Sequence, residues 1–172
     1  AVGRYMPQKG FDRLIPAWKI VSEKHPDWKL RIYGDGMREE LQKQINNLGV
    51  SSTCILEHSV QNIVDKYCES SIFVLSSRFE GFGMVITEAM ICGVPPVSFT
   101  CPCGPRDIIE DGIDGLLVEN GDIHGLADKI SYLIDNEKTR KQMGQKAHDN
   151  VKRFKIENIA LQWKRIFETV VK

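Results

Sequence analysis

The chain has 172 residues, and its 23 Lys and Arg residues balance 23 Asp and Glu residues, so the formal net charge is zero. This length allows one domain with a substantial core and without disulfides or a structural metal. The balanced charge excludes a global basic field that would recruit nucleic acid or an anionic membrane, so any anion must be held by a local site. No apolar run approaches the roughly 20 residues that a transmembrane helix needs.

Five scattered cysteines, an odd number, favour reduced thiols in a cytoplasmic protein. Cys101 and Cys103 form a close pair, but no second pair or histidine lies at ligand spacing, so we expect loop thiols and no metal site. The chain opens with the strand-like residues 1–3 and has no initiator Met. We therefore expect it to be part of a longer protein.

Apolar β-prone runs alternate with helical patterns through the first two thirds of the chain, which is typical of βα units and a parallel sheet. The expected strands, in chain order, are residues 1–4, 30–33, 53–56, 71–75, 96–99 and 116–118. The expected helices among them are residues 10–25, a helix carrying Leu41, Ile45 and Leu48, residues 61–68 and residues 84–92. From Asp122 the pattern is helical and closes with residues 156–171. This predicts one Rossmann-like three-layer α/β domain over residues 1–172, with about six parallel strands, helices on both faces and a helical C-terminus.

Ligands of an open parallel sheet bind beyond the carboxyl ends of the strands, close to helix N-termini. Gly3, Gly34 and Gly36 follow expected strands, where glycine lets the backbone approach a ligand; ordinary turn formation is the alternative. Arg4 and Lys9 bracket the loop after the first strand. Arg can form two parallel bonds to phosphate and Lys supplies a point charge, so the pair suits a diphosphate, although solvated surface cations are the alternative.

The most informative segment is residues 76–88, Ser-Ser-Arg-Phe-Glu-Gly-Phe-Gly-Met-Val-Ile-Thr-Glu, which combines a strand end, a glycine-rich loop and a helix start. We expect Glu80 to project from the loop and Glu88 to lie about one turn into the helix, where the two carboxylates share a pocket but differ in task. The free amides of residues 83–85 predict an anion site that carries roughly half a positive charge from the helix dipole.

Together these motifs resemble the family-four glycosyltransferases and their GT-B relatives. Glu80 and Glu88 match the family's pattern of two glutamates separated by seven residues, in the context Ser-X-X-Glu-Gly-Phe-Gly. Residues 3–4, residues 9–12 and residues 32–36 match further family motifs in the family's order, so the resemblance covers nearly the whole chain. It implies the C-terminal, donor-binding half of a GT-B enzyme, with the N-terminal acceptor domain absent from this chain.

The resemblance also implies roles for individual residues. Arg4 and Lys9 would hold the donor diphosphate, and Glu80 would contact hydroxyls of the donor sugar, which makes these three the expected catalytic residues. Glu88 would accept hydrogen bonds from the ribose hydroxyls. The other expected substrate-binding residues are Gly3, Gly34, Gly36, Gly81, Phe82, Gly83, Met84 and Val85.

The implied reaction is transfer of a glycosyl group, with retention, from a nucleoside diphosphate sugar to an acceptor hydroxyl in cell-surface polysaccharide or glycolipid biosynthesis. Uridine diphosphate is the first choice, with guanosine and adenosine diphosphates as competitors. The missing domain would hold a glycan or lipid-linked acceptor, and the parent protein would be cytoplasmic or peripheral at the inner membrane face. We expect no cofactor, metal or nucleic acid. The alternatives are a GT-B nucleotide-sugar epimerase and a non-catalytic flavodoxin- or receiver-like domain.

The chain departs from the family pattern after the strand at residues 96–99. Many members have a Gly-Gly-X-X-Glu loop there, whereas this chain has Cys-Pro-Cys-Gly-Pro-Arg-Asp at residues 101–107. Gly104 would stand in for a family glycine, and Asp107 is shorter than the usual glutamate. Two interpretations of Arg106 stay open, a phosphate contact and a residue on a helix surface.

Overall fold

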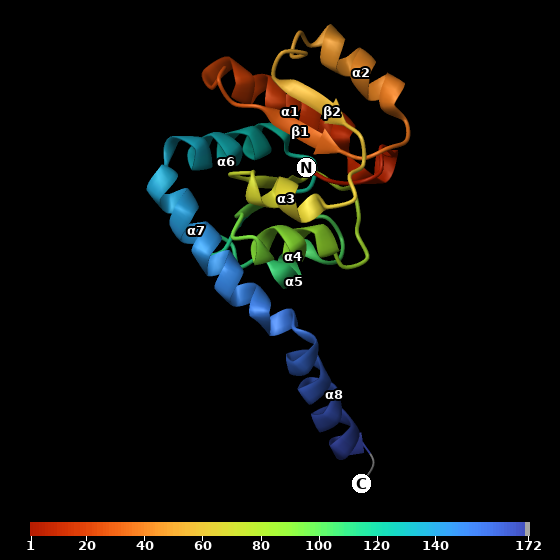
Figure 1. Ribbon diagram of the computed structural model, residues 1–172, viewed down its shortest axis with the longest axis vertical. Coiled ribbons are helices and arrows are strands. Elements are labelled where there is room, and N and C mark those ends of the chain that lie inside the picture. The colour runs from red at the N-terminus through yellow and green to blue at the C-terminus, as the bar shows by residue number, and fades with distance from the viewer. Residues whose placement is uncertain (171–172) are drawn as a thin grey trace.

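Strands and helices alternate along most of the chain in the computed structural model, which describes residues 1–170 (Figure 1). The strands are β1 (Leu30–Tyr33), β2 (Cys54–Glu57), β3 (Phe73–Leu75), β4 (Pro96–Phe99) and β5 (Leu116–Val118). The helices are η1 (Pro7–Lys9), α1 (Phe11–Lys24), α2 (Arg38–Asn47), α3 (Ile63–Cys68), α4 (Met84–Ile91), α5 (Pro105–Ile108), α6 (Ile123–Asp135), α7 (Glu137–Asn150), η2 (Val151–Phe154) and α8 (Ile156–Val170). The predicted Rossmann-like α/β fold is therefore confirmed.

All strand pairs of the described residues are parallel, in one sheet of order β1-β2 and another of order β3-β4-β5. The strands at residues 30–33, 96–99 and 116–118 have the predicted bounds. The strand expected at residues 1–4 is reduced to a single parallel bridge between Val2 and Tyr33, because the chain bends at Gly3. The described part of the chain therefore has five strands where about six were expected.

The hydrophobic core has two parts. One lies around α1, α6, β1, β2 and β4, with Leu14, Ile32 and Leu126 fully buried. The other gathers around α4, β3 and α7, with Ile86 and Met90 fully buried. Both faces of β3 and β4 are buried, which explains why their sequences are largely apolar and do not alternate with polar residues.

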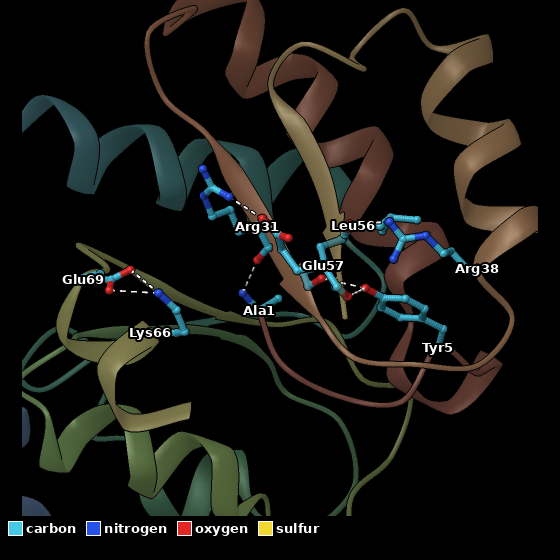
Figure 2. A network of polar contacts seen from close by, with 9 residues as sticks. Ala1, Tyr5, Arg31, Arg38, Leu56, Glu57, Lys66 and Glu69 are labelled. Atoms are coloured by element: carbon cyan, nitrogen blue, oxygen red, sulfur yellow. Dashed lines mark hydrogen bonds and ion pairs between the residues drawn. The ribbon is translucent and has the colours of Figure 1, made fainter. Parts of the chain in front are cut away.

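A buried tyrosine fixes the segment that carries Gly3 and Arg4. The Tyr5 hydroxyl donates a hydrogen bond to the carbonyl oxygen of Ile32 at 2.7 Å and also bonds the carbonyl oxygen of Glu57. Figure 2 shows the Tyr5 ring pointing toward the end of β2, where Arg38 donates to a neighbouring carbonyl. Burial raises the pKa of Tyr5 to about 12, so its hydroxyl stays a donor at neutral pH. The loop after residue 3 is thus held at the carboxyl ends of β1 and β2.

The last helix, α8, extends away from the rest of the molecule (Figure 1). Its exposed large apolar side chains are Ile156, Leu161, Trp163, Ile166, Phe167 and Val170. The helix was predicted to reach Val171, which lies outside the described residues. Within residues 1–170, no helix combines the length and the apolar character that crossing a bilayer requires.

Candidate functional site

The centre of the predicted site is an ion pair between Lys9 and Glu80. Lys9 ends η1, and Glu80 lies in the loop between β3 and α4. The Lys9 ammonium lies 2.8 Å from Oε1 and 3.2 Å from Oε2 of Glu80, and the Ser77 hydroxyl donates to Oε1 at 2.5 Å. Only 16% of the Lys9 side chain and 8% of the Glu80 side chain are exposed. Removing either partner would therefore leave the other charge poorly solvated.

Several further hydrogen bonds join the loops that carry these two residues. The Ser76 hydroxyl donates to the carbonyl oxygen of Lys9 at 2.9 Å, and the Arg78 amide donates to that of Gln8 at 2.7 Å. The Arg78 guanidinium forms two bonds to the Asp12 carboxylate, at 2.6 and 2.7 Å, which hold the pKa of Asp12 below its usual value. The two loops consequently form one unit, although their residues lie far apart in the sequence.

Gly3, Gly34 and Gly36 lie where segments of the protein itself come close together, and their predicted approach to a ligand stays a prediction. A Cβ atom on Gly34 would lie 2.0 Å from the carbonyl oxygen of Gly3, and one on Gly36 would lie 2.7 Å from that of Tyr5. A Cβ atom on Gly3 would come within 3.1 Å of the Lys9 side chain. Larger residues do not fit at Gly34 without movement of the backbone, and the Lys9 stem crosses directly over the segment that leads to Arg4.

Arg4 is exposed and forms no ion pair with another residue in the range 1–170. It lines a pocket of about 400 Å³ beyond the carboxyl ends of β1 and β2. The other residues that line this pocket are Val2, Gly3, Tyr33, Gly34, Asp35, Ser59, Val60 and Ile63. Lys9 does not line it, because its ammonium turns to Glu80. Of the two cations expected to bind the diphosphate, only Arg4 lines this pocket.

Asp35 lines this pocket and holds the residues that follow β2, contacts that the sequence did not reveal. Its carboxylate lies 2.9 Å from Nδ1 of His58 and accepts a bond from the Ser59 amide at 3.2 Å. Hydrogen bonds from Ser59 and His58 lower the pKa of Asp35, so it is ionised at neutral pH. His58 and Ser59 directly follow β2, and this position at the carboxyl end of a parallel strand is the signal that would have identified them.

Helix α4 begins as the sequence predicted. Gly83 precedes it with φ of 92°, a left-handed conformation that favours glycine, and no side chain caps the helix. Its first amides are therefore available to an anion. Phe82 and Met84 are exposed beside this terminus, whereas the Val85 side chain packs against the core, so only the Val85 backbone can serve a ligand. Gly81 is exposed, and a Cβ atom at this position would have no neighbouring atom within 4 Å.

Glu88 lies on the second turn of α4 and is half-buried. Its Oε2 accepts a hydrogen bond of 2.9 Å from the hydroxyl of Tyr67 on α3. Tyr67 was not singled out in the sequence, because nothing local connects it with a carboxylate 21 residues later. Glu80 and Glu88 thus have different partners within the protein, and the different tasks expected of them stay a prediction.

The loop at residues 101–107 packs against the glycine-rich loop. The Glu80 amide donates to the carbonyl oxygen of Pro102 at 3.2 Å, and a Cβ atom on Gly104 would overlap the carbonyl oxygen of Phe82. The Asp107 carboxylate accepts from the Gly104 amide at 3.2 Å and so caps its own short helix. Arg106 pairs with Glu119 at 3.2 Å on the surface, which favours the helix-surface interpretation.

Comparison with known proteins identifies the family of this chain. The family model for glycosyl transferases group 1 matches residues 1–150. An exopolysaccharide phosphotransferase of Streptomyces coelicolor is 36% identical over 98% of this chain, which covers 18% of that protein. A poly(ribitol-phosphate) alpha-N-acetylglucosaminyltransferase of Staphylococcus aureus is 31% identical over 98% of the chain and 34% of its own length.

The likeness extends to solved structures. A mutant of S. aureus TarM, crystallised with Fondaparinux, alpha-GlcNAc-glycerol and UDP, is 31% identical, with a TM-score of 0.91 over 96% of this chain and 34% of that one. The chain thus spans only part of the length of these relatives. Its Glu80 and Glu88 motif, its parallel strands and these matches agree: the chain belongs to the group 1 glycosyl transferases and has the Rossmann-like architecture of a GT-B domain.

Proposed function

We propose that this chain is the donor-binding domain of a glycosyltransferase and binds a nucleoside diphosphate sugar. One observation carries the proposal: Lys9 crosses Gly3 and reaches Glu80, which joins the Arg4 loop to the loop that ends at the uncapped N-terminus of α4. Arg4, Lys9 and the free amides of α4 therefore all belong to segments at the carboxyl ends of parallel strands. This is the arrangement that suits the phosphates of a nucleotide.

The diphosphate would lie between Arg4 and the first amides of α4. The Lys9 ammonium has three N–H donors, so it can add a bond to phosphate while it keeps its contact with Glu80. Negative charge grows on the departing diphosphate during glycosyl transfer. Arg4, Lys9 and the dipole of α4 would stabilise that charge without reorganising, and such preorganised electrostatics usually dominate catalysis.

The two carboxylates would then bind the remaining parts of the donor, the ribose and the transferred sugar. Glu88 would accept hydrogen bonds from the ribose hydroxyls, and Glu80 would contact hydroxyls of the sugar. The pocket beside Arg4 combines the apolar Val2 and Ile63 with the polar Asp35 and is large enough for a nucleobase. A uracil base is favoured because UDP is bound to the similar TarM structure.

The acceptor would be a glycan or lipid-linked glycan of the cell surface, as the names of the relatives suggest, and the sugar would be transferred with retention. We place the acceptor site in an N-terminal domain of a longer parent protein, because this chain covers only 34% of the S. aureus relative. The five free thiols favour a cytoplasmic location. No metal is required in this proposal, since the cations and the α4 amides carry the leaving-group charge.

Calorimetric titration of the chain with UDP, GDP, ADP and uridine tests the proposal. We expect UDP to bind most tightly, uridine to bind more weakly, and the affinity for UDP to be unchanged in a metal chelator. Failure of all three nucleoside diphosphates to bind would contradict a donor-binding role. Loss of binding in the chelator would contradict the absence of a metal from the site.

A further inference from the structure

The hydrogen bond between Tyr67 and Glu88 links a buried phenol to one of the carboxylates of the proposed donor site. Tyr67 is only 2% exposed, and its ring packs edge-on against Phe73 with a centroid distance of 5.8 Å. Burial and this packing hold the ring, and the hydroxyl oxygen, which lies on the ring axis, is held with it. From there it donates to Oε2 of Glu88 at 2.9 Å.

The chemistry of this pair sets what Glu88 can still bind. Burial and the nearby Glu88 carboxylate raise the pKa of Tyr67 above its usual value, so the phenol stays protonated and acts only as donor toward Glu88. A carboxylate has about four lone-pair sites, and the Tyr67 hydroxyl occupies one of them on Oε2. Oε1 and the remaining lone pair of Oε2 stay available to hydroxyl groups of a ligand.

Without a hydrogen-bonding partner, the carboxylate of a glutamate is not held in one orientation. Its side chain has several rotatable bonds, so ordering it costs conformational entropy. A side chain that is already held in one orientation before the ligand arrives avoids much of this cost on binding. Among residues 1–170, Tyr67 is the hydrogen-bonding side chain that meets the Glu88 carboxylate.

We propose that Tyr67 is a positioning residue that holds the Glu88 carboxylate ready to accept hydrogen bonds from the two adjacent hydroxyls of a ribose. The inference rests on the proposed function, in which Glu88 contacts the ribose. Tyr67 itself touches no ligand. Its contribution is therefore confined to ligands that carry the hydroxyls, whereas a purely structural link between α3 and α4 would affect all ligands alike.

The test compares UDP with 2′,3′-dideoxy-UDP, which lacks both ribose hydroxyls, by calorimetric titration of the chain and its Tyr67→Phe variant. Phenylalanine keeps the ring packing and removes only the hydroxyl. We expect the variant to bind UDP about five- to tenfold more weakly, the size of one hydrogen bond. Its affinity for the dideoxy analogue should equal that of the unaltered chain.

Two further variants control the comparison. Tyr132 is half-exposed on α6, an element that carries none of the proposed donor-site residues, so Tyr132→Phe should leave both affinities unchanged. In a Glu88→Gln background, Tyr67→Phe should have little further effect on UDP, because the residues act through one another. The thermal midpoints of all variants show whether a loss of affinity merely follows a loss of stability.

The possible results distinguish a failure of the positioning role of Tyr67 from a failure of the proposed ribose contact of Glu88. If the unaltered chain prefers UDP over the analogue and Tyr67→Phe keeps that preference, the positioning role of Tyr67 is wrong while the ribose contact stands. Equal losses for both ligands in Tyr67→Phe would likewise assign Tyr67 a structural role. If the unaltered chain binds both ligands equally, Glu88 does not contact the ribose, and the proposed function of Glu88 fails together with the inference.

Discussion

The carboxylates of Glu80 and Glu88 lie eight residues apart in the chain, yet the fold gives one a cationic partner and the other a neutral partner. Glu80 faces the ammonium of Lys9 at 2.8 Å, so its charge is compensated inside the protein. Glu88 faces the neutral hydroxyl of Tyr67, so its charge remains available to a ligand. One glycine-rich loop followed by one helix thus carries a carboxylate whose charge the protein itself balances and a second carboxylate that pairs with no cation among residues 1–170.

The largest expected effect concerns stability at the Glu80 end. Lys9→Ala should lower the free energy of unfolding by about 3 kcal/mol, because it leaves the Glu80 carboxylate buried without a cation. Arg4→Ala, the matched control, removes an exposed cation without an ion-pair partner and should change stability by less than about 0.5 kcal/mol. Urea unfolding measures both. Equal losses for the two variants would contradict the contrast between a paired and an unpaired cation.

Phosphate binding should depend on the exposed cation. Arg4→Ala is expected to weaken UDP binding by about 1.5–3 kcal/mol, the range for hydrogen bonds to charged groups, or roughly ten- to a hundredfold in dissociation constant. Uridine affinity should not change, because the lost contact is to phosphate. Calorimetry with both ligands decides the matter, and a parallel loss for uridine would remove Arg4 from the phosphate site.

The two carboxylates should differ in their effect on the nucleoside. Glu88→Gln is expected to weaken uridine binding about fivefold, or ~1 kcal/mol, through the ribose hydroxyls. Glu80→Gln, matched to it in chemistry, should leave uridine binding unchanged. Titration of both variants with uridine is the measurement. If Glu80→Gln damaged uridine binding as much, the division of labour between the two residues would be wrong.

The smallest expected effect concerns the ion pair of Asp12 with Arg78, which ties the Lys9 loop to the Glu80 loop. Arg78 lowers the pKa of Asp12 from its usual 3.8. The stabilisation is therefore fully present above pH 3.8 and is lost as the pH falls through the lowered pKa. Both side chains are partly exposed, so Asp12→Asn should cost less than about 1 kcal/mol at neutral pH.

Thermal unfolding of the chain and its Asp12→Asn variant, measured from neutral to acidic pH, checks this sign. The difference between the two midpoints should shrink below pH 3.8. A difference that grew in acid would mean that another group, and not the Asp12 carboxylate, dominates the titration of this region.

The fold could be predicted from the sequence because its signals are local. Residues 96–99 and 116–118 are apolar runs bounded by turn residues, and Asp122 precedes an amphipathic helix that it caps through the Gly125 amide at 2.9 Å. The first strand was overestimated, because the apolar start of the chain gave no indication that the bend at Gly3 would limit the pairing to one bridge.

The pairing within the site could not be predicted in the same way. Lys9 and Glu80 are 71 residues apart, and a sequence pattern assigns each to a loop without giving the distance between the loops. The sequence therefore grouped Lys9 with its neighbour Arg4, whereas the fold turns it to Glu80. Tyr67 could not be identified for a related reason. In the sequence it resembles an ordinary core residue of a short helix, and only the structure shows its hydroxyl bonded to the Glu88 carboxylate.

The binding mode of the donor can be seen in a crystal structure of the chain with bound UDP. We expect the phosphate oxygens to contact Arg4 and the first amides of α4, and the ribose hydroxyls to contact Glu88, whose bond to Tyr67 is kept. Glu80 should still hold Lys9. A structure in which the ribose hydroxyls lie on Glu80, or in which the diphosphate lies away from the N-terminus of α4, would contradict the account.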